Sequence, residues 1–309
     1  MSALPSGDGA GLSAPRTETD RGAPLDRHAL YEACVQSPEH LVPLLRAIHG
    51  GEPAVLGEDF CGTAALARAW LRLVPNARAI GLDLAAEVLE RGAHEAWRAG
   101  MRVEHARPNR WILRSDSASE PSELRPELEL VCGDARAACA LDLRRCDVVF
   151  AGNFSIGELA TRADLLHYLR GAHARLADGG VFVCDTYGGA HAFRTGAVER
   201  VHRLRDGRRI RYTWEQRSAD PRDARVVNAL HFRVEDRGEI VQELTDAFVY
   251  RWRLWSLAEL ADAFVEAGFT DVRAWRELTE DAIVARAVET SEEFGEDWIV
   301  CTSARVARR

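Results

Sequence analysis

Short apolar runs alternate with longer amphipathic stretches along residues 54–187. Runs of about four to eight apolar residues are typical of buried strands, whereas longer stretches with apolar residues at helical spacing are typical of helices. Strands that alternate with helices predict βαβ units and a largely parallel sheet. The predicted strands are 54–60, 77–84, 128–134, 147–154 and 181–187, and the predicted helices are 64–74, 85–100 and 162–180.

The period of the pattern changes from helical to twofold after Tyr187. Alternating runs continue from there, and Asp206-Gly207 separates the first two. An Asp-Gly pair between alternating runs is typical of a β-hairpin. Residues 197–254 therefore predict an antiparallel meander that is inserted into the parallel domain.

The helix-and-strand pattern resumes after the meander. Ser256 predicts the start of a helix, and Gly268 predicts its end. Residues 269–275 and 297–306 predict two further strands, so that the expected sheet has seven strands and is mostly parallel. The predicted divisions are a disordered segment at 1–25, a first part of the α/β domain at 26–196, the inserted meander at 197–254 and a second part of the α/β domain at 255–309.

Three segments lie outside this alternation. Residues 1–25 are too polar to pack and predict disorder. Residues 27–48 predict a covering helix, with a break near Ser37-Pro38. Residues 101–127 are polar and interrupted by proline, which predicts a surface insertion without assigned chemistry.

The charge of the chain favours small-molecule partners over nucleic acid. The 40 basic residues are outnumbered by 48 acidic ones, and the formal net charge is −8. Every basic residue is arginine, which excludes a Schiff-base lysine and a Walker-type phosphate loop. The oligomeric state is not legible from the sequence.

The seven cysteines form no Cys-x-x-Cys pair, and their number is odd. This pattern is not that of a disulfide framework or a zinc site, and it indicates a reducing compartment. The sequence has no apolar run long enough to cross a membrane and no apolar signal core near its start. We therefore expect a cytoplasmic protein with no metal and no membrane association.

Polar residues and glycines lie at or just beyond the carboxyl ends of the first three predicted strands. Because parallel sheets bind ligands at the carboxyl ends of their strands, these residues are candidates for ligand binding. They are Glu58 and Gly62 around the end of the first strand, Asp83 at the end of the second, and Gly133-Asp134 at the end of the third. An ordinary strand-to-helix turn at Gly62 and plain helix caps at the two aspartates remain open alternatives. The position of Asp83, about twenty residues beyond the glycine turn, favours a carboxylate that accepts from ribose hydroxyls.

A polar and aromatic segment, residues 153–158, follows the fourth strand. It could lie beside a reacting group, and simple loop packing is an equally open alternative. The fifth strand ends in Asp185, followed by Tyr187 and a pair of glycines that lead into the meander.

The order of these motifs, closing with LADGG at 176–180, resembles that of class I S-adenosylmethionine-dependent methyltransferases over about residues 27–305. More narrowly, EDFCGTAALARAW, GLDL, NFSIGEL, DTYGG, TWEQR and YRWRLWSLAEL resemble a bacterial group of such enzymes without an assigned acceptor. The resemblance implies a Rossmann-like class I methyltransferase fold, with the meander as a lid. It also implies S-adenosylmethionine as the cofactor.

The resemblance further implies that Glu58 and Gly62 lie near the methionine portion of the cofactor. It implies that Asp83 lies near the ribose, and that Asp134 and Ala135 lie near the adenine. The complete set of residues that it implies for cofactor binding is Glu58, Phe60, Cys61, Gly62, Thr63, Asp83, Leu84, Gly133, Asp134, Ala135, Asn153, Phe154 and Ser155.

One departure from the family pattern concerns the glycine-rich turn. Phe60 and Ala64 occupy the two outer glycine positions, and only Gly62 remains. A pyrophosphate needs a backbone without side chains at this turn, so the departure disfavours a dinucleotide. S-adenosylmethionine has no phosphate, and its cationic sulfonium suits the acidic Glu58-Asp59 pair.

The residues that contact the methyl acceptor are harder to identify from the sequence. Methyl transfer needs alignment of the two reactants and exclusion of water more than it needs a universal base. We expect transfer to a nitrogen or oxygen atom of a small molecule. The candidates for acceptor contact are Tyr187, Trp214, Glu215 and Arg251, on the hypothesis that the meander covers the acceptor. Glu215 could orient an amine, and Arg251 could hold a carboxylate.

Three other functions stay open at this point. One is a non-catalytic module that senses S-adenosylmethionine or a nucleotide, and another is a nicotinamide-dependent oxidoreductase. The third is an RNA methyltransferase, suggested by a basic strip that could meet phosphates, although such strips are more often the solvated face of an edge hairpin. The strip consists of Arg200, His202, Arg203, Arg205, Arg208, Arg209 and Arg211.

Overall fold

The computed structural model describes residues 24–116, 125–276, 286–288 and 293–308. These residues form two compact units. The large unit consists of residues 37–192 and 252–309, and the small unit consists of residues up to Gln36 together with 193–251. Each unit is described separately below.

The large unit is built on a ten-stranded sheet with the order β13-β12-β14-β7-β6-β1-β2-β5-β4-β3. Its five central strands, from β7 to β5, are parallel to one another. The outer strands are antiparallel to their neighbours. This arrangement confirms the predicted α/β class with a parallel core. The strands are β1 (Val55–Asp59), β2 (Arg78–Asp83), β3 (Met101–Arg107), β4 (Arg110–Ser115), β5 (Glu127–Cys132), β6 (Cys146–Ala151), β7 (Leu176–Gly188), β12 (Thr270–Arg276), β13 (Arg286–Ala287) and β14 (Trp298–Arg305).

Among the described residues the sheet has ten strands, three more than the seven predicted. Residues 101–127 were expected to form a surface insertion, yet they contain the hairpin β3-β4 and the start of β5. β3 lies at the edge of the sheet and is largely exposed, so its sequence lacks the apolar run that marks a buried strand. The very short β13 adds the third extra strand.

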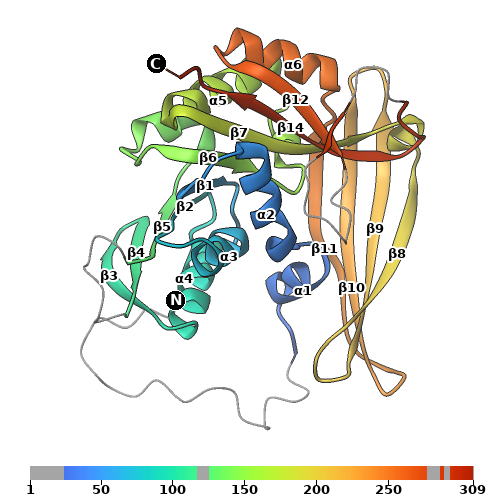
Figure 1. Ribbon diagram of the computed structural model, residues 1–309. Helices are drawn as coiled ribbons and strands as arrows, with labels where there is room; N and C mark the ends of the chain where they lie inside the picture. Colours follow the sequence, from blue (N-terminus) through green and yellow to red (C-terminus); the bar gives the residue numbers. More distant parts are fainter. Residues whose placement is uncertain (1–23, 117–124, 277–285, 289–292, 309) are drawn as a thin grey trace. The chain divides into compact units, whose positions relative to one another are not determined.

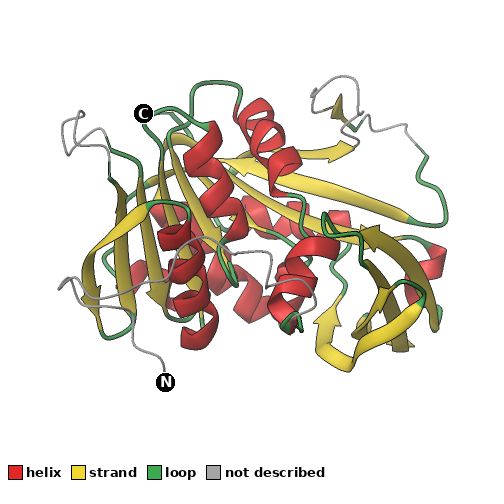
Figure 2. Cartoon of the chain, turned by 90° about the horizontal axis from the view of Figure 1, so that it is seen from below, coloured by secondary structure: helices red, strands yellow, loops and turns green. Residues whose placement is uncertain are grey.

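Helices cover both faces of this sheet. α2, α3 and α4 lie on one face, and α5 and α6 lie on the other (Figure 1). Figure 2 shows the same helices from below, in red. Ser256 begins α6 with a capping box to Glu259, as its sequence position predicted, and Gly268 follows the helix with a φ of 99°. The bounds are α2 (Pro38–His49), α3 (Ala65–Leu73), α4 (Ala86–Arg98), α5 (Arg162–Arg175) and α6 (Leu257–Glu266), with short 3₁₀ turns η3 (Ala135–Ala140), η4 (Ser155–Glu158) and η5 (Ala190–Phe193).

Aromatic residues from distant parts of the sequence form the main core of the large unit. Tyr168 of α5, Phe182 of β7 and Phe264 of α6 are fully buried. The Phe182 ring lies 5.9 Å from the Tyr168 ring and 5.6 Å from the Phe264 ring, measured between centroids. Aromatic side chains of this size contribute several kcal/mol of burial energy, at about 25 cal/mol per Å². This core holds the strands whose carboxyl ends carry the candidate residues.

The small unit is an antiparallel sheet of four strands, in the order β11-β10-β9-β8. It matches the meander that the twofold pattern predicts (Figure 1). Its core includes Tyr212, Leu230 and Phe232, and Leu30 of helix α1 packs into the same cluster. The elements are α1 (Arg27–Cys34), β8 (Gly196–Arg203), β9 (Arg209–Asp220), β10 (Arg225–Asp236) and β11 (Glu239–Arg253).

The predicted covering helix at 27–48 is two helices, separated at Ser37-Pro38. The first of them, α1, groups with the small unit. The predicted first part of the α/β domain, 26–196, therefore differs from the large unit of the structure, which starts at Ser37. The prediction of disorder for residues 1–25 falls almost entirely outside the described residues.

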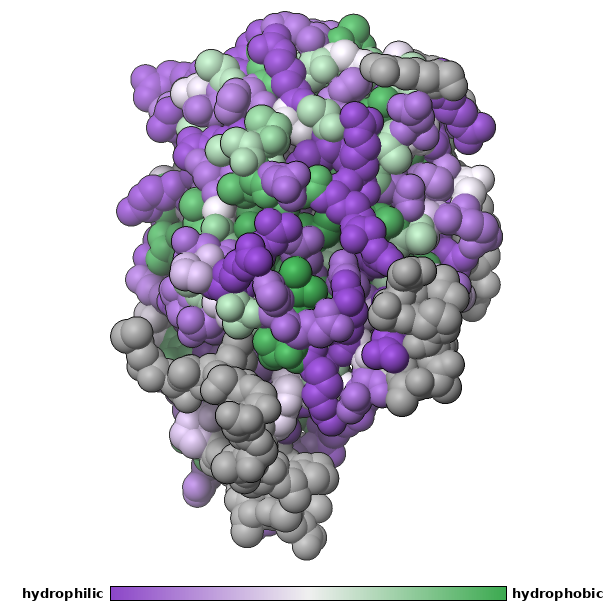
Figure 3. Space-filling view, turned by 90° about the vertical axis from the view of Figure 1, so that its left-hand side faces the viewer, coloured by the Kyte–Doolittle hydropathy of each residue, from purple (hydrophilic) through white to green (hydrophobic). Residues whose placement is uncertain are grey.

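Hydrophilic residues cover much of one face of the molecule (Figure 3). Figure 3 shows a face that is mostly hydrophilic, with hydrophobic residues exposed in its middle. Arginines on this kind of surface commonly pair with carboxylates, for example Arg46 with Glu52 at 2.6 Å and Arg72 with Glu39 at 2.7 Å. Among the described residues, no helix is both long enough and apolar enough to span a membrane.

Candidate functional site

The turn between β1 and α3 has a left-handed backbone at three alternate residues. Phe60, Gly62 and Ala64 have φ values of 56°, 53° and 56°. The two non-glycine residues thus adopt the conformation that glycine would adopt, at a cost of about 1–2 kcal/mol each. The departure from the glycine-rich pattern changes the side chains of the turn while its backbone keeps a glycine-like form.

Asp83, at the end of the neighbouring strand β2, holds this turn in place. Its Oδ2 accepts the Gly62 N–H at 2.8 Å, and its Oδ1 accepts the Ala85 N–H at 2.9 Å. The Cys61 N–H also donates to the Leu82 carbonyl at 3.0 Å. The carboxylate therefore links the ends of β1 and β2, in addition to any role in ligand binding.

Two glycines outside the turn allow its close packing. A Cβ on Gly81 would lie 2.9 Å from the Cys61 sulfur, and a Cβ on Gly92 of α4 would lie 2.5 Å from the Thr63 carbonyl oxygen. The second contact involves backbone, which has little freedom to move. Sequence reasoning missed Gly92, although a glycine inside a predicted helix is itself a signal of close approach.

The two acidic residues at the end of β1 have different partners. Asp59 is buried, and it accepts hydrogen bonds from Tyr168 Oη at 2.8 Å and from Arg175 Nη2 at 2.5 Å. Its charge is thus balanced inside the core, and the expectation that the pair serves a cationic ligand together was wrong for Asp59. Glu58 is also buried, and it accepts the Ala67 N–H in the first turn of α3 at 2.8 Å.

At the end of β5, Asp134 is a helix cap. Its side chain accepts the Arg136 N–H at 2.9 Å and pairs with the Arg136 guanidinium at 2.6 Å. The hydrogen bonds from Arg136 lower the pKa of the Asp134 carboxyl. The Gly133 N–H donates to the Asp83 carbonyl at 2.9 Å, which joins this turn to the preceding one. Ala135 is buried.

Leu84 follows Asp83 directly and has an exposed side chain, at 66% of its full accessible area. Its carbonyl accepts the Cys132 thiol at 3.4 Å, so its backbone lies between the ends of β2 and β5. An exposed leucine at this edge of the sheet is available to pack on a flat apolar ligand.

The turn after β6 repeats the left-handed backbone. Asn153 and Phe154 have φ values of 55° and 60°. Their N–H groups donate to the two oxygens of Asp185 on β7, at 2.9 Å and 2.7 Å. The surrounding protein raises the pKa of Asp185 to about 6 by desolvation, although the residue keeps some exposed surface. Asp185 was not among the predicted site residues.

Aromatic side chains gather around this second turn. The Phe154 ring lies 4.9 Å from the ring of Tyr187 and 6.0 Å from that of Trp252, between centroids. Ser155 begins η4, at the end of which Glu158 accepts a hydrogen bond from Trp252 Nε1 at 2.7 Å. The structure therefore brings together two predicted site residues, Phe154 and Tyr187, and adds Trp252 and Glu158.

The other three acceptor candidates belong to the small unit. Trp214 donates from Nε1 to Asn228 Oδ1 at 3.1 Å, and Glu215 pairs with Arg217 at 2.8 Å. Arg251 is exposed near the end of β11. Their role at an acceptor stays a prediction.

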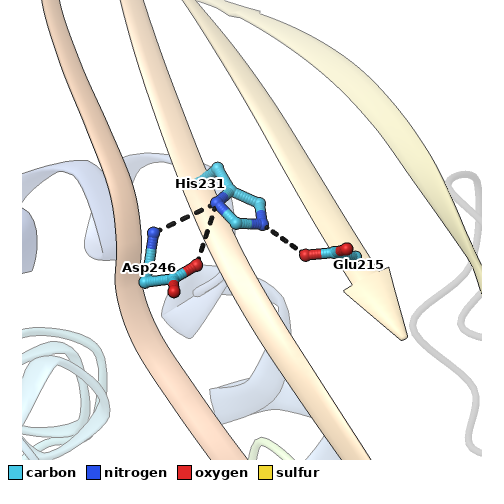
Figure 4. Close-up of side chains that lie close together, drawn as sticks. All are labelled: Glu215, His231 and Asp246. Carbon is cyan, nitrogen blue, oxygen red and sulfur yellow. Dashed lines mark hydrogen bonds and ion pairs between the residues drawn. The ribbon is translucent and has the colours of Figure 1, made fainter. Parts of the chain in front are cut away.

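Glu215 also belongs to a cluster with His231 and Asp246 that has the spacing of metal ligands (Figure 4). The Asp246 N–H donates to His231 Nδ1 at 3.1 Å, and His231 Nε2 lies 3.1 Å from Glu215 Oε2. Arg217 pairs with both carboxylates. The single positive charge of Arg217 offsets one of the two carboxylate charges of the cluster.

The basic strip is partly neutralised within the small unit. Arg208 pairs with Asp206 at 2.8 Å, Arg209 pairs with Glu235 at 2.8 Å, and Arg211 bonds to Glu199 at 2.5 Å. Such local pairing favours a solvated sheet face over a phosphate-binding surface.

Comparison with known proteins identifies the fold. No family model and no curated protein matches the sequence. The structure is similar to a solved S-adenosylmethionine-dependent methyltransferase from Clostridium acetobutylicum, with a TM-score of 0.59 and 14% identity over 91% of this chain and 97% of that one. The chain therefore has the Rossmann-like fold of S-adenosylmethionine-dependent methyltransferases.

Two further similar structures have more specific names. CalS10, solved with the cofactor bound, is an amino pentose methyltransferase from Micromonospora echinaspora involved in calicheamicin biosynthesis; it has a TM-score of 0.58 and 18% identity, over 95% of this chain and 99% of that one. KedS8 from Streptoalloteichus is a sugar N-methyltransferase with a TM-score of 0.55 and 15% identity, over the full length of both chains.

Proposed function

We propose that this protein is an S-adenosylmethionine-dependent methyltransferase that acts on a nitrogen or oxygen atom of a small molecule. The observation that carries the proposal is the edge of the large sheet at which β1, β2 and β5 end. There Asp83 joins the glycine-like turn of residues 60–64 to its own strand. The fold shared with solved methyltransferases supports the same assignment.

The residues at this edge fit the chemistry of the cofactor. Glu58 is a buried carboxylate that accepts a backbone N–H group of α3, and its negative charge suits a cationic sulfonium. Asp83 lies at the strand end where a carboxylate can accept from ribose hydroxyls. Leu84 offers an exposed apolar surface beside it.

The side chains at positions 60 and 64 weigh against a dinucleotide, because they occupy places where a pyrophosphate would need bare backbone. The proposed cofactor contacts are those that the sequence motifs imply from Glu58 to Ala135, and we assign Asn153, Phe154 and Ser155 to the acceptor side instead. When bound, S-adenosylmethionine supplies a methyl group on a sulfonium, from which the acceptor's lone pair takes the methyl carbon while the electrons of the broken bond stay on sulfur.

The protein's own part is to bind and orient the two reactants and to exclude water. The turn of residues 152–158 follows β6, which pairs directly with β1. This neighbouring position makes it the proposed acceptor side. The names of the similar proteins CalS10 and KedS8 support a small-molecule acceptor.

Calorimetric titration tests the proposal. S-adenosylmethionine and S-adenosylhomocysteine are titrated into the wild-type protein and into Asp83→Ala, with NADH as the control ligand. We expect micromolar binding of the first two ligands to the wild type and a loss of about tenfold or more in the variant. No binding, or a preference for NADH, would reject the methyltransferase assignment.

A further inference from the structure

Glu158 differs from two other crowded carboxylates of the large unit, Asp59 and Glu127, in having no cationic partner among the described residues. Asp59 pairs with Arg175, and Glu127 pairs with Arg114, both at 2.5 Å. Within the part of the chain that the structure describes, the only side chain that bonds to Glu158 is the neutral indole of Trp252.

The packing of η4 explains how Glu158 reaches this place. Gly157 has no room for a side chain, because a Cβ there would lie 2.8 Å from Trp252 Cβ and 3.2 Å from the Arg253 carbonyl oxygen. The backbone of η4 therefore lies directly against Trp252. The next residue, Glu158, then receives the indole N–H at 2.7 Å.

The Glu158 carboxylate is open to solvent, yet protein atoms crowd around it. The Glu158 side chain is exposed overall, and desolvation by neighbouring protein atoms nevertheless raises the pKa of its carboxyl group. Its Oε2 accepts no hydrogen bond from the described residues, whereas Oε1 holds the indole.

One aromatic ring contacts this carboxylate, and two further rings continue the cluster from it. Trp252 bonds to it, and the Trp252 ring lies 6.0 Å from the Phe154 ring, which in turn lies 4.9 Å from that of Tyr187. Phe154 and Tyr187 are both partly exposed. A desolvated carboxylate together with aromatic rings favours a cation, through charge and through cation–π attraction.

We propose that Glu158, with Phe154, Tyr187 and Trp252, binds the amino group of the methyl acceptor, so that the acceptor is an amine. This inference rests on the proposed methyltransferase function. An amine is the cation that fits, because an ammonium can lose a proton and regain the lone pair that attacks a methyl carbon. The Glu158 carboxylate can accept that proton, after which the neutral amine is the nucleophile.

Binding of matched probes tests this assignment. The wild type, Glu158→Gln and the control Glu90→Gln are titrated with cyclohexylamine and with cyclohexanol, in the presence of saturating S-adenosylhomocysteine. Glutamine keeps the shape of Glu158 and can still accept the indole N–H, but it removes the charge. Glu90 is an exposed carboxylate on α4, so its variant reports on a general loss of surface charge.

We expect the wild type and Glu90→Gln to bind the amine about tenfold or more tightly than the alcohol, and Glu158→Gln to lose that preference. Tritium transfer from labelled S-adenosylmethionine is expected to the amine and not to the alcohol. Equal binding of the two probes to the wild type, binding of neither, or an unchanged preference in Glu158→Gln would overturn the assignment.

The cofactor titration separates the two proposals. If S-adenosylhomocysteine binds the wild type and Glu158→Gln equally well while the amine preference is absent, only the amine assignment fails. If S-adenosylhomocysteine binds neither protein, the methyltransferase function itself fails.

Discussion

The turns after β1 and β6 lie at the same edge of the large sheet, and both place non-glycine residues in the left-handed conformation. Each is held by an aspartate from the end of a neighbouring strand, Asp83 for the first turn and Asp185 for the second. In this way a carboxylate that accepts backbone N–H groups stabilises a conformation that would otherwise cost about 1–3 kcal/mol per residue.

The two turns differ in how they are supported. Asp83 accepts one N–H group from the first turn, and glycines at 81 and 92 let that turn pack closely against a strand and a helix. Asp185 accepts two N–H groups from the second turn and has a pKa raised to about 6 by desolvation. The first turn thus depends mainly on packing, and the second depends mainly on one carboxylate.

Gly92→Ala is expected to have the largest effect, because it attacks the packing of the first turn. The new methyl group would lie 2.5 Å from the Thr63 carbonyl oxygen. We expect the free energy of unfolding, measured in urea, to fall by about 3 kcal/mol, and the affinity for S-adenosylhomocysteine to fall with it.

The matched control is Gly171→Ala in α5, which is also a buried glycine inside a helix. Its Cβ would lie 3.9 Å from the nearest atom, the Arg136 carbonyl oxygen. Since alanine is the better helix former, we expect this variant to be more stable than the wild type by about 0.5–1 kcal/mol. Equal losses in the two variants would show that packing against the turn is not what matters at Gly92.

A pair of conservative variants separates the roles of the two aspartates. Asp83→Asn is expected to weaken binding of S-adenosylhomocysteine by about tenfold, because it removes the charge from a carboxylate at the proposed cofactor side. Asp185→Asn is expected to leave the affinity for S-adenosylhomocysteine within about threefold of the wild-type value, because the substitution lies on the proposed acceptor side. Calorimetric titration of both variants measures the difference. A larger loss in Asp185→Asn would mean that the second turn also holds the cofactor.

The positions of Glu58 and Asp83 were predictable from the sequence, because apolar periodicity alone shows where a buried strand ends. The contacts of Asp185 were not predictable. They depend on the left-handed backbone of Asn153 and Phe154, which points two consecutive N–H groups at one carboxylate, and neither residue type demands that conformation.

The pairing of Trp252 with Glu158 could not be predicted from the sequence either, since the two residues are 94 positions apart and the whole meander lies between them in sequence. Prediction of the fold was limited in the same way. Apolar runs identified the five central strands, whereas the hairpin of residues 101–115 was missed. β3 is largely exposed and carries few apolar residues, and the apolar run of β4 is only three residues long.

The pH dependence of stability is expected to show the smallest effect, and it tests the second turn. The pKa of Asp185 is raised from 3.8 to about 6 in the folded protein. The folded state therefore holds the Asp185 proton at pH values where the unfolded state has lost it, so that this residue's contribution to stability increases as the pH falls from 7 to 5. Asp185→Asn removes the titrating group but keeps its shape. We expect the wild type to gain about 1 kcal/mol more than the variant between these pH values in urea unfolding.

Titration of the thiols nearest to Asp185 does not affect this measurement. Burial raises the pKa of Cys184 to about 12 and that of Cys301 well above its usual value, so both stay protonated throughout the range. Taking the difference between wild type and variant also cancels the other carboxylates, which are common to both. Parallel pH profiles would mean that Asp185 titrates normally, and the second turn would then be held by an ordinary ionised carboxylate, like the first.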